Sequence, residues 1–140
     1  MTVDPAPPIQ PPRLRRLLRR LVDIYSPSGK EEEILGYLSG YLKRSDLPVT
    51  RQDVDDSRYN LLVMPPEMNI RLAFVGHVDT VSAYDLDSYE YEEENDEIFG
   101  LGAADMKGGC AAMIEAYRNA YEKLRGRLPA ALVLVVGEEE

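Results

Sequence analysis

An unbroken apolar run at residues 131–136 constrains the fold of this chain more than any other segment. A strand with one solvated face alternates apolar and polar residues, whereas an unbroken run is typical of a strand buried on both faces. Residues 70–75 form a second strongly apolar strand candidate, and a helix-like pattern separates the two. Strands of this kind need helices on both sides of their sheet. The sequence therefore predicts an α/β fold with a mixed sheet flanked by helices.

The other elements follow from hydrophobic periodicity and turn signals. Leucines at i, i+3, i+4 and i+7 predict a helix that begins at Arg13, with arginines around the rest of its surface. A second helix is expected to begin at Ser28, where Glu31 three residues later completes a capping box. Further strands are predicted at 49–54 and 59–63, a loop or hairpin at 84–97, and a long helix from about 106 to 124.

The two ends of the sequence differ from its middle. Prolines crowd residues 1–12 and block regular backbone hydrogen bonding, so this segment is predicted to be a disordered leader. Residues 13–140 are predicted to form one domain. We expect that domain to be incomplete, because the last strand is followed only by residues 137–140 and no covering helix.

Composition disfavours several classes of partner. The net charge of −9 argues against nucleic acid, because phosphate binding requires a basic surface, and leaves a small-molecule substrate open. No segment approaches the roughly 20 apolar residues of a membrane helix or resembles a secretory signal, so we expect a cytoplasmic protein without a membrane partner. The basic helix after residue 13 is an alternative membrane-docking element, but its short apolar stripe without Trp or Phe favours packing on the domain.

Three short segments carry residues suited to metal chemistry, and the first is GHVDTV at 76–81. Residues i and i+2 of an extended chain point to the same side, so His77 and Asp79 can lie together after the strand at 70–75. A carboxylate in this position commonly orients a metal-binding histidine. Taken alone, the same two residues are more typical of an ordinary loop.

The second segment is GLGAADMKGG at 100–109, where glycines on both sides of Asp105 indicate tight backbone geometry before a helix. Asp105 is either the N-cap of that helix or a carboxylate that bridges two metal ions. Lys107 is an unexpected neighbour for a cation site, which a solvated side chain would explain. Cys110 is the single cysteine and cannot form an internal disulfide, and we interpret it as a small buried residue between helix and sheet.

The third segment is GEEE at 137–140, directly after the buried strand. Three adjacent carboxylates repel one another unless water or a cation compensates their charge. They form either a solvated loop or a metal site in which one glutamate is a ligand and its neighbour acts as base on water. All three segments lie at carboxyl ends of strands or in the turns that follow. Open α/β sheets place their sites there, and the nitrogen and carboxylate ligands together suit zinc.

In this order and at these separations, the three segments resemble the zinc-dependent exopeptidases and deacylases. This family includes acetylornithine deacetylase, succinyl-diaminopimelate desuccinylase, aminoacylase and carboxypeptidase G. SPSGKEEE at 26–33 and Asn60 fit the same family, so the resemblance covers roughly residues 13–140. It implies the N-terminal part of a di-zinc catalytic domain. The lid or dimerisation domain, and the acidic and histidine ligands that members carry after the glutamate pair, are absent from these 140 residues.

The resemblance also implies a role for each residue. His77 is a ligand of one metal with Asp79 as the partner that orients it, Asp105 bridges two ions, Glu138 is the general base and Glu139 is the next ligand. The ions are zinc, with cobalt as an alternative. A shift by one residue, to Glu139 and Glu140, stays open, although Gly137 before the pair favours Glu138.

The implied activity is hydrolysis of the amide bond of an N-acyl amino acid by metal-activated water. Acetyl or succinyl groups on a diamino acid are the favoured targets, and dipeptidases and aminopeptidases of the same family are the nearest alternative. A truncated non-catalytic chain and a binding module are the alternatives from other classes. The implied partners are an acyl amino acid or short peptide and, in full-length members, a second copy. We expect the 140 residues alone to have little or no activity.

Overall fold

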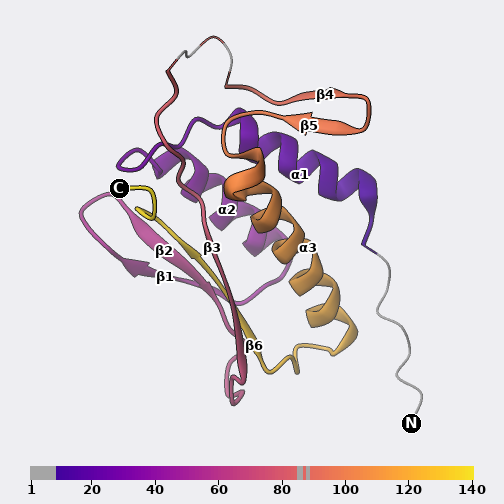
Figure 1. The fold of residues 1–140 in the computed structure, drawn as a ribbon. Helices are drawn as coiled ribbons and strands as arrows, with labels where there is room; N and C mark the ends of the chain where they lie inside the picture. Colours follow the sequence, from indigo (N-terminus) through magenta and orange to yellow (C-terminus); the bar gives the residue numbers. More distant parts are fainter. Residues whose placement is uncertain (1–8, 85–86, 88) are drawn as a thin grey trace.

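The computed structural model describes residues 9–84, 87 and 89–140, in which helices pack against a mixed sheet (Figure 1). The strand order is β1 (Val49–Asp53), β2 (Tyr59–Val63), β6 (Ala130–Val135) and β3 (Leu72–His77). β2 pairs antiparallel with both β1 and β6, whereas β3 and β6 are parallel, with His77 opposite Val135. Because neighbouring parallel strands end at the same edge, the segments that follow β3 and β6 lie side by side.

The helices α1 (Pro11–Asp23), α2 (Glu32–Arg44) and α3 (Gly108–Lys123) cover one face of this sheet (Figure 1). None of the helices in the described part of the chain is long and apolar enough to span a bilayer. Apolar side chains of all three helices form the core with alternate residues of β2 and β6. The core includes Leu17, Leu21, Ile34, Leu38, Ile114, Leu61, Leu132 and Leu134.

The mixed α/β sheet with helices is confirmed, and the described helices all lie on one face of that sheet. β3 lies at an edge of the sheet, and Val75, which points away from the helices, is 56% exposed. An apolar run predicts burial of both faces, yet no described element covers the second face. The run at 131–136 therefore indicates strand character correctly without indicating what packs on it.

Two predicted boundaries are wrong. α1 begins at Pro11, so Pro11 and Pro12 belong to the helix rather than to a leader; proline is tolerated there because first-turn N–H groups lack intrahelical partners. The other predicted leader residues up to 8 lie outside the described residues. α2 begins at Glu32 rather than Ser28, because the side chains of Ser28 and Glu31 bind distant segments instead of capping the helix.

The segment predicted as a loop or hairpin contains a hairpin of β4 (Glu92–Glu94) and β5 (Glu97–Phe99). Its turn residues Asn95 and Asp96 have φ angles of 52° and 63°, the left-handed conformation that a type I′ turn requires. Residues 85, 86 and 88 of this prediction lie outside the described residues. The hairpin lies along α1 (Figure 1), where Arg15 and Glu93 form an ion pair of 3.4 Å.

The exposed apolar edge of β3 predicts self-association of the isolated chain. Phe74 and Val75 are 44% and 56% exposed on a strand with one edge unpaired in the described sheet, and such edges pair readily with other chains. We expect Val75→Lys to lower the oligomer fraction in sedimentation velocity, and to change the free energy of unfolding by less than about 0.5 kcal/mol. Gln52→Lys places the same charge on β1, the opposite edge. An equal decrease with both variants would show that net charge governs association.

Candidate metal centre

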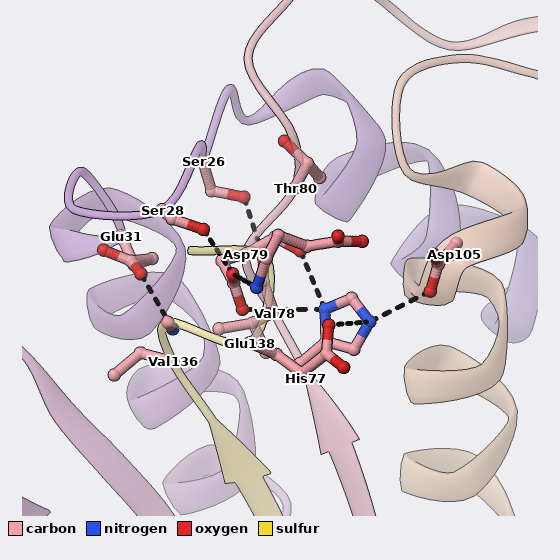
Figure 2. Close-up of polar contacts among 12 residues, drawn as sticks. Ser26, Ser28, Glu31, His77, Val78, Asp79, Thr80, Asp105, Val136 and Glu138 are labelled. Atoms are coloured by element: carbon pink, nitrogen blue, oxygen red, sulfur yellow. Dashed lines mark hydrogen bonds and ion pairs between the residues drawn. The ribbon is translucent and has the colours of Figure 1, made fainter.

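The three predicted segments meet at the edge where β3 and β6 end (Figure 2). β3 ends at His77, which pairs with Val135 of β6. Glu138 and Glu139 follow β6, and Asp105 lies in the turn before α3. Figure 2 shows His77 between Asp105 on one side and Asp79 on the other.

The imidazole of His77 has one nitrogen directed at the backbone and the other at carboxylates. Nδ1 lies 2.9 Å from the carbonyl oxygen of Asp79. Because a carbonyl only accepts hydrogen bonds, Nδ1 carries a proton. Nε2 lies 2.9 Å from Oδ1 of Asp105 and 3.7 Å from Oε2 of Glu138. Burial lowers the pKa of His77, but the bonds to Asp105 and the Asp79 carbonyl outweigh it and raise the pKa above its ordinary value. Nε2 is therefore the nitrogen available to a metal.

Asp79 is a buried carboxylate that contacts both the histidine and the turn after β6. Its Oδ2 accepts hydrogen bonds from Ser28 Oγ at 2.6 Å and from the Glu139 N–H at 2.8 Å. Its Oδ1 lies 3.5 Å from His77 Nδ1 and has no hydrogen bond within the described residues. Burial alone would raise the pKa of Asp79, and the bonds from Ser28 and Glu139 instead bring it below its ordinary value.

Asp105 lies in a turn rather than at the start of a helix. Gly102 has a left-handed φ of 75°, and its carbonyl accepts a 2.8 Å bond from the Lys107 N–H, which closes the turn η2 (Ala103–Lys107). α3 begins at Gly108 with Lys107 before it, so the N-cap interpretation of Asp105 is wrong. The peptide bond between Asp105 and Met106 is cis. The Asp105 side chain is 74% exposed and points at His77, as a metal ligand would.

Lys107 is buried rather than solvated. Only 2% of it is exposed, its Nζ donates to the carbonyl oxygen of Ile24 at 2.7 Å, and burial lowers its pKa to about 8. Lys107 therefore ties the Asp105 turn to the end of α1. Cys110 is buried as predicted: its thiol donates to the His77 carbonyl at 3.2 Å, and burial raises its pKa to about 12, unlike that of a thiolate ligand.

The three glutamates after β6 point in different directions. Single ligand atoms of Glu139, His77 and Asp105 all lie within 4.8 Å of one another. The Glu138 side chain is 56% exposed beside them. Glu140 faces away and accepts a 2.6 Å bond from Arg58. This division favours Glu138 and Glu139 over Glu139 and Glu140 as the functional pair.

The donor set fits a divalent cation. An imidazole nitrogen and two carboxylates within reach of one another are ligands that zinc and cobalt both accept. Desolvation and, after it, the charge and hydrogen bond of Asp105 raise the pKa of Glu139 above its ordinary value. A cation among these carboxylates would favour their charged forms.

Ser28, Glu31 and Asn60 contribute to the site through contacts that the local sequence does not predict. Ser28 binds Asp79, while Glu31 and Asn60 accept hydrogen bonds from the backbone of Gly137 and Val136. The fit of SPSGKEEE at 26–33 and of Asn60 to the family motifs is the one sequence signal for their contribution. From the sequence alone, a local helix cap explains Ser28 and Glu31 as well as a role in the site does. Their partners in the structure, Asp79 and Gly137, lie far away in the chain.

Comparison with known proteins gives the same family as the motifs. Residues 73–140 match the sequence model of Peptidase family M20/M25/M40. A probable succinyl-diaminopimelate desuccinylase of Staphylococcus epidermidis is 36% identical over 72% of this chain and 26% of its own length. Acetylornithine deacetylase of Aliivibrio fischeri is 34% identical over 62% of this chain and 24% of its own length. The chain thus spans about a quarter of the length of these curated relatives.

Solved structures share the fold. A tripeptidase from Staphylococcus aureus superposes with a TM-score of 0.74 at 26% identity, over 94% of this chain and 38% of that chain. Aminopeptidase PepT from Bacillus cereus superposes with a TM-score of 0.75 at 27% identity, over the same shares of the two chains, 94% and 38%. Sequence motifs, family match and fold agree: residues 73–140 match Peptidase family M20/M25/M40, and the described fold is shared with part of a tripeptidase and of an aminopeptidase.

Proposed function

We propose that this chain provides part of the active site of a metal-dependent hydrolase that cleaves the amide bond of N-acyl amino acids, of the deacetylase or desuccinylase type. The convergence of His77, Asp105 and Glu139 within 4.8 Å, beside Glu138, carries the proposal. The desuccinylase and deacetylase among its relatives support this substrate class.

His77, Asp105 and Glu139 would hold the cation, for which we propose zinc, with cobalt as the alternative; a second ion bridged by Asp105 belongs to the same proposal. When bound, the metal supplies Lewis-acid polarisation of the scissile carbonyl and of water. Glu138 accepts the proton of the attacking water on its carboxylate and delivers it to the leaving amine. Asp79 stabilises the His77 ring through its carbonyl and carboxylate, so that Nε2 stays directed into the site.

Peptide hydrolysis is the second candidate. The similarity to a tripeptidase and to an aminopeptidase supports it. Both candidates require the same attack on an amide carbonyl, and they differ in the group on the acyl side of that bond. His77, Asp105, Glu138 and Glu139 would have the same roles in either reaction.

We expect the 140-residue chain to bind about one zinc ion and to hydrolyse substrates no faster than free zinc does. The chain has one histidine, so a second ion would lack nitrogen ligation from these residues. Titration calorimetry measures the stoichiometry, and amine release from acetylornithine, succinyl-diaminopimelate and simple dipeptides measures turnover.

Each result of this experiment bears on a different part of the proposal. A chain that binds no zinc contradicts the metal site, and rapid turnover by the 140 residues contradicts the expected need for further ligands. If the reading frame continues past codon 140, the full-length protein can be assayed with the same substrates. Those assays would distinguish deacylase activity from peptidase activity.

A further inference from the structure

The turn that carries Glu138 and Glu139 is held through its backbone by side chains from separate segments. Three backbone N–H groups of this turn donate to side-chain oxygens: Val136 to Asn60 at 3.2 Å, Gly137 to Glu31 at 3.2 Å, and Glu139 to Asp79 at 2.8 Å. Figure 2 shows the Glu31 carboxylate reaching the start of this turn. Asp79 belongs to the proposed site already, whereas Glu31 has no part in the chemistry described above.

Glu31 is an unusual acceptor because it is fully buried. Its exposure is 0%, and its Oε1 also lies 3.4 Å from Nη1 of Arg58, while its Oε2 has no hydrogen-bond partner in the described residues. Burial of a carboxylate is unfavourable unless paired charges and hydrogen bonds compensate. An apolar residue of similar size would fill this position at lower cost, so the carboxylate is explained best by the contacts it makes.

Glu31 and Arg58 together contact the residues on both sides of Glu138 and Glu139, namely Gly137 and Glu140. Gly137 has a left-handed φ of 70°, a conformation that glycine adopts easily and also leaves easily. The bond from its N–H to Glu31 removes that freedom directly before Glu138. After Glu139, the same Arg58 Nη1 that faces Glu31 donates to Glu140 at 2.6 Å.

We propose that Glu31 is a positioning residue for Glu138 and Glu139, acting through the Gly137 N–H and through Arg58. It fixes the turn so that Glu139 faces His77 and Asp105 while Glu140 is directed away. This inference rests on the proposed function, because it assigns Glu31 a purpose at the same metal site.

The test compares zinc affinity in variants of the 140-residue chain by calorimetry. Glu31→Met fills the same volume without an acceptor, and we expect its zinc affinity to fall about tenfold, as for other residues that orient metal ligands. Glu31→Gln keeps an oxygen for the Gly137 N–H and is expected to stay within about threefold of the unsubstituted chain. Glu33→Ala removes a nearby exposed carboxylate and is the matched control, with unchanged affinity.

Stability and amide exchange separate positioning from a general structural role. Because methionine suits a buried position and Arg58 keeps Asp55 and Glu140 as partners, Glu31→Met is expected to stay folded, with an unfolding midpoint close to that of the unsubstituted chain, while zinc affinity falls. Hydrogen exchange of the Gly137 amide, measured without metal, is expected to be slow in the unsubstituted chain and fast in Glu31→Met. That measurement on the unsubstituted chain needs no variant to fold.

The outcomes distinguish this inference from the proposed function. An unsubstituted chain that binds no zinc defeats the proposed function. A chain that binds zinc through His77 but shows unchanged affinity in Glu31→Met, or a Gly137 amide that exchanges as freely as a solvated one, defeats the positioning role alone. Equal losses in Glu31→Met and Glu31→Gln would also overturn it, since the retained acceptor would then have no effect.

Discussion

Replacing His77 by alanine is expected to weaken zinc binding at least about 100-fold, which corresponds to about 2.7 kcal/mol of binding free energy. His77 is the single histidine of the sequence and supplies the one nitrogen ligand of the cluster. Without His77, only the carboxylate oxygens of Asp105 and Glu139 would remain to bind the ion. Calorimetry measures the change, and circular dichroism checks that the variant is folded. An affinity within threefold of the unsubstituted chain would exclude His77 as a ligand.

The single histidine also allows a direct spectroscopic measurement of the same site. Because Nδ1 faces the Asp79 carbonyl, zinc is expected to shift the ¹⁵N resonance of Nε2 while Nδ1 keeps its proton. The adjacent glutamates give a matched pair of variants. Glu139→Gln is expected to lower zinc affinity about tenfold, and Glu138→Gln to change it less than about threefold, since we propose Glu138 as the base rather than a ligand. The opposite order would exchange the two roles.

Replacing Gly102 by alanine is expected to lower the free energy of unfolding by about 2–4 kcal/mol. Its φ of 75° is unfavourable for any residue with a Cβ, and an added Cβ would lie 2.5 Å from Cγ2 of Thr80. Thr80 follows Asp79 directly, so the clash would push the Asp105 turn away from the histidine loop. Zinc affinity is therefore expected to fall together with stability. Urea denaturation and calorimetry on the same preparation measure both.

A second glycine provides the control for this substitution. Gly36 lies inside α2 with nothing within 4 Å of an added Cβ. Gly36→Ala is expected to raise the free energy of unfolding by about 0.5–1 kcal/mol, because glycine disfavours helix interiors. If the free energy of unfolding falls in Gly102→Ala and rises in Gly36→Ala, the loss at Gly102 comes from the backbone and packing of the Asp105 turn. A small effect at both positions would contradict the geometry of that turn.

Elements with strong periodicity could be predicted from the sequence, and their exact contacts could not. The leucine stripe of α1 and the apolar run of β6 each indicate one element type, because few other structures bury such patterns. Pairing order is a property of the whole sheet. β6 lies between β2 and β3 in the sheet although it follows both of them in the sequence. No local pattern specifies that arrangement. The uncovered face of β3 is unpredictable for the same reason.

Within the candidate site, the sequence predicts which residues lie close together but not what surrounds them. His77, Asp105 and Glu139 do lie together, because each directly follows or precedes a well-predicted element. The sequence is compatible with a solvated Lys107 and predicts Glu31 in a helix cap, yet both are buried. Their partners, the Ile24 carbonyl and the Gly137 N–H, are backbone groups. Backbone acceptors and donors have no sequence signature, so such contacts emerge only from the folded structure.

The proposed ligand residues of the site come from segments that are far apart along the chain. His77 and Asp105 are separated by 28 positions, and Asp79 and the Glu139 backbone that it binds by 60. A cation shared by His77, Asp105 and Glu139 would therefore act as a reversible crosslink that the unfolded chain cannot retain. Free zinc at 100 times its dissociation constant would then stabilise the folded chain by about 2.7 kcal/mol. A chelator would lower the melting temperature of this protein, which would therefore report the zinc activity around it.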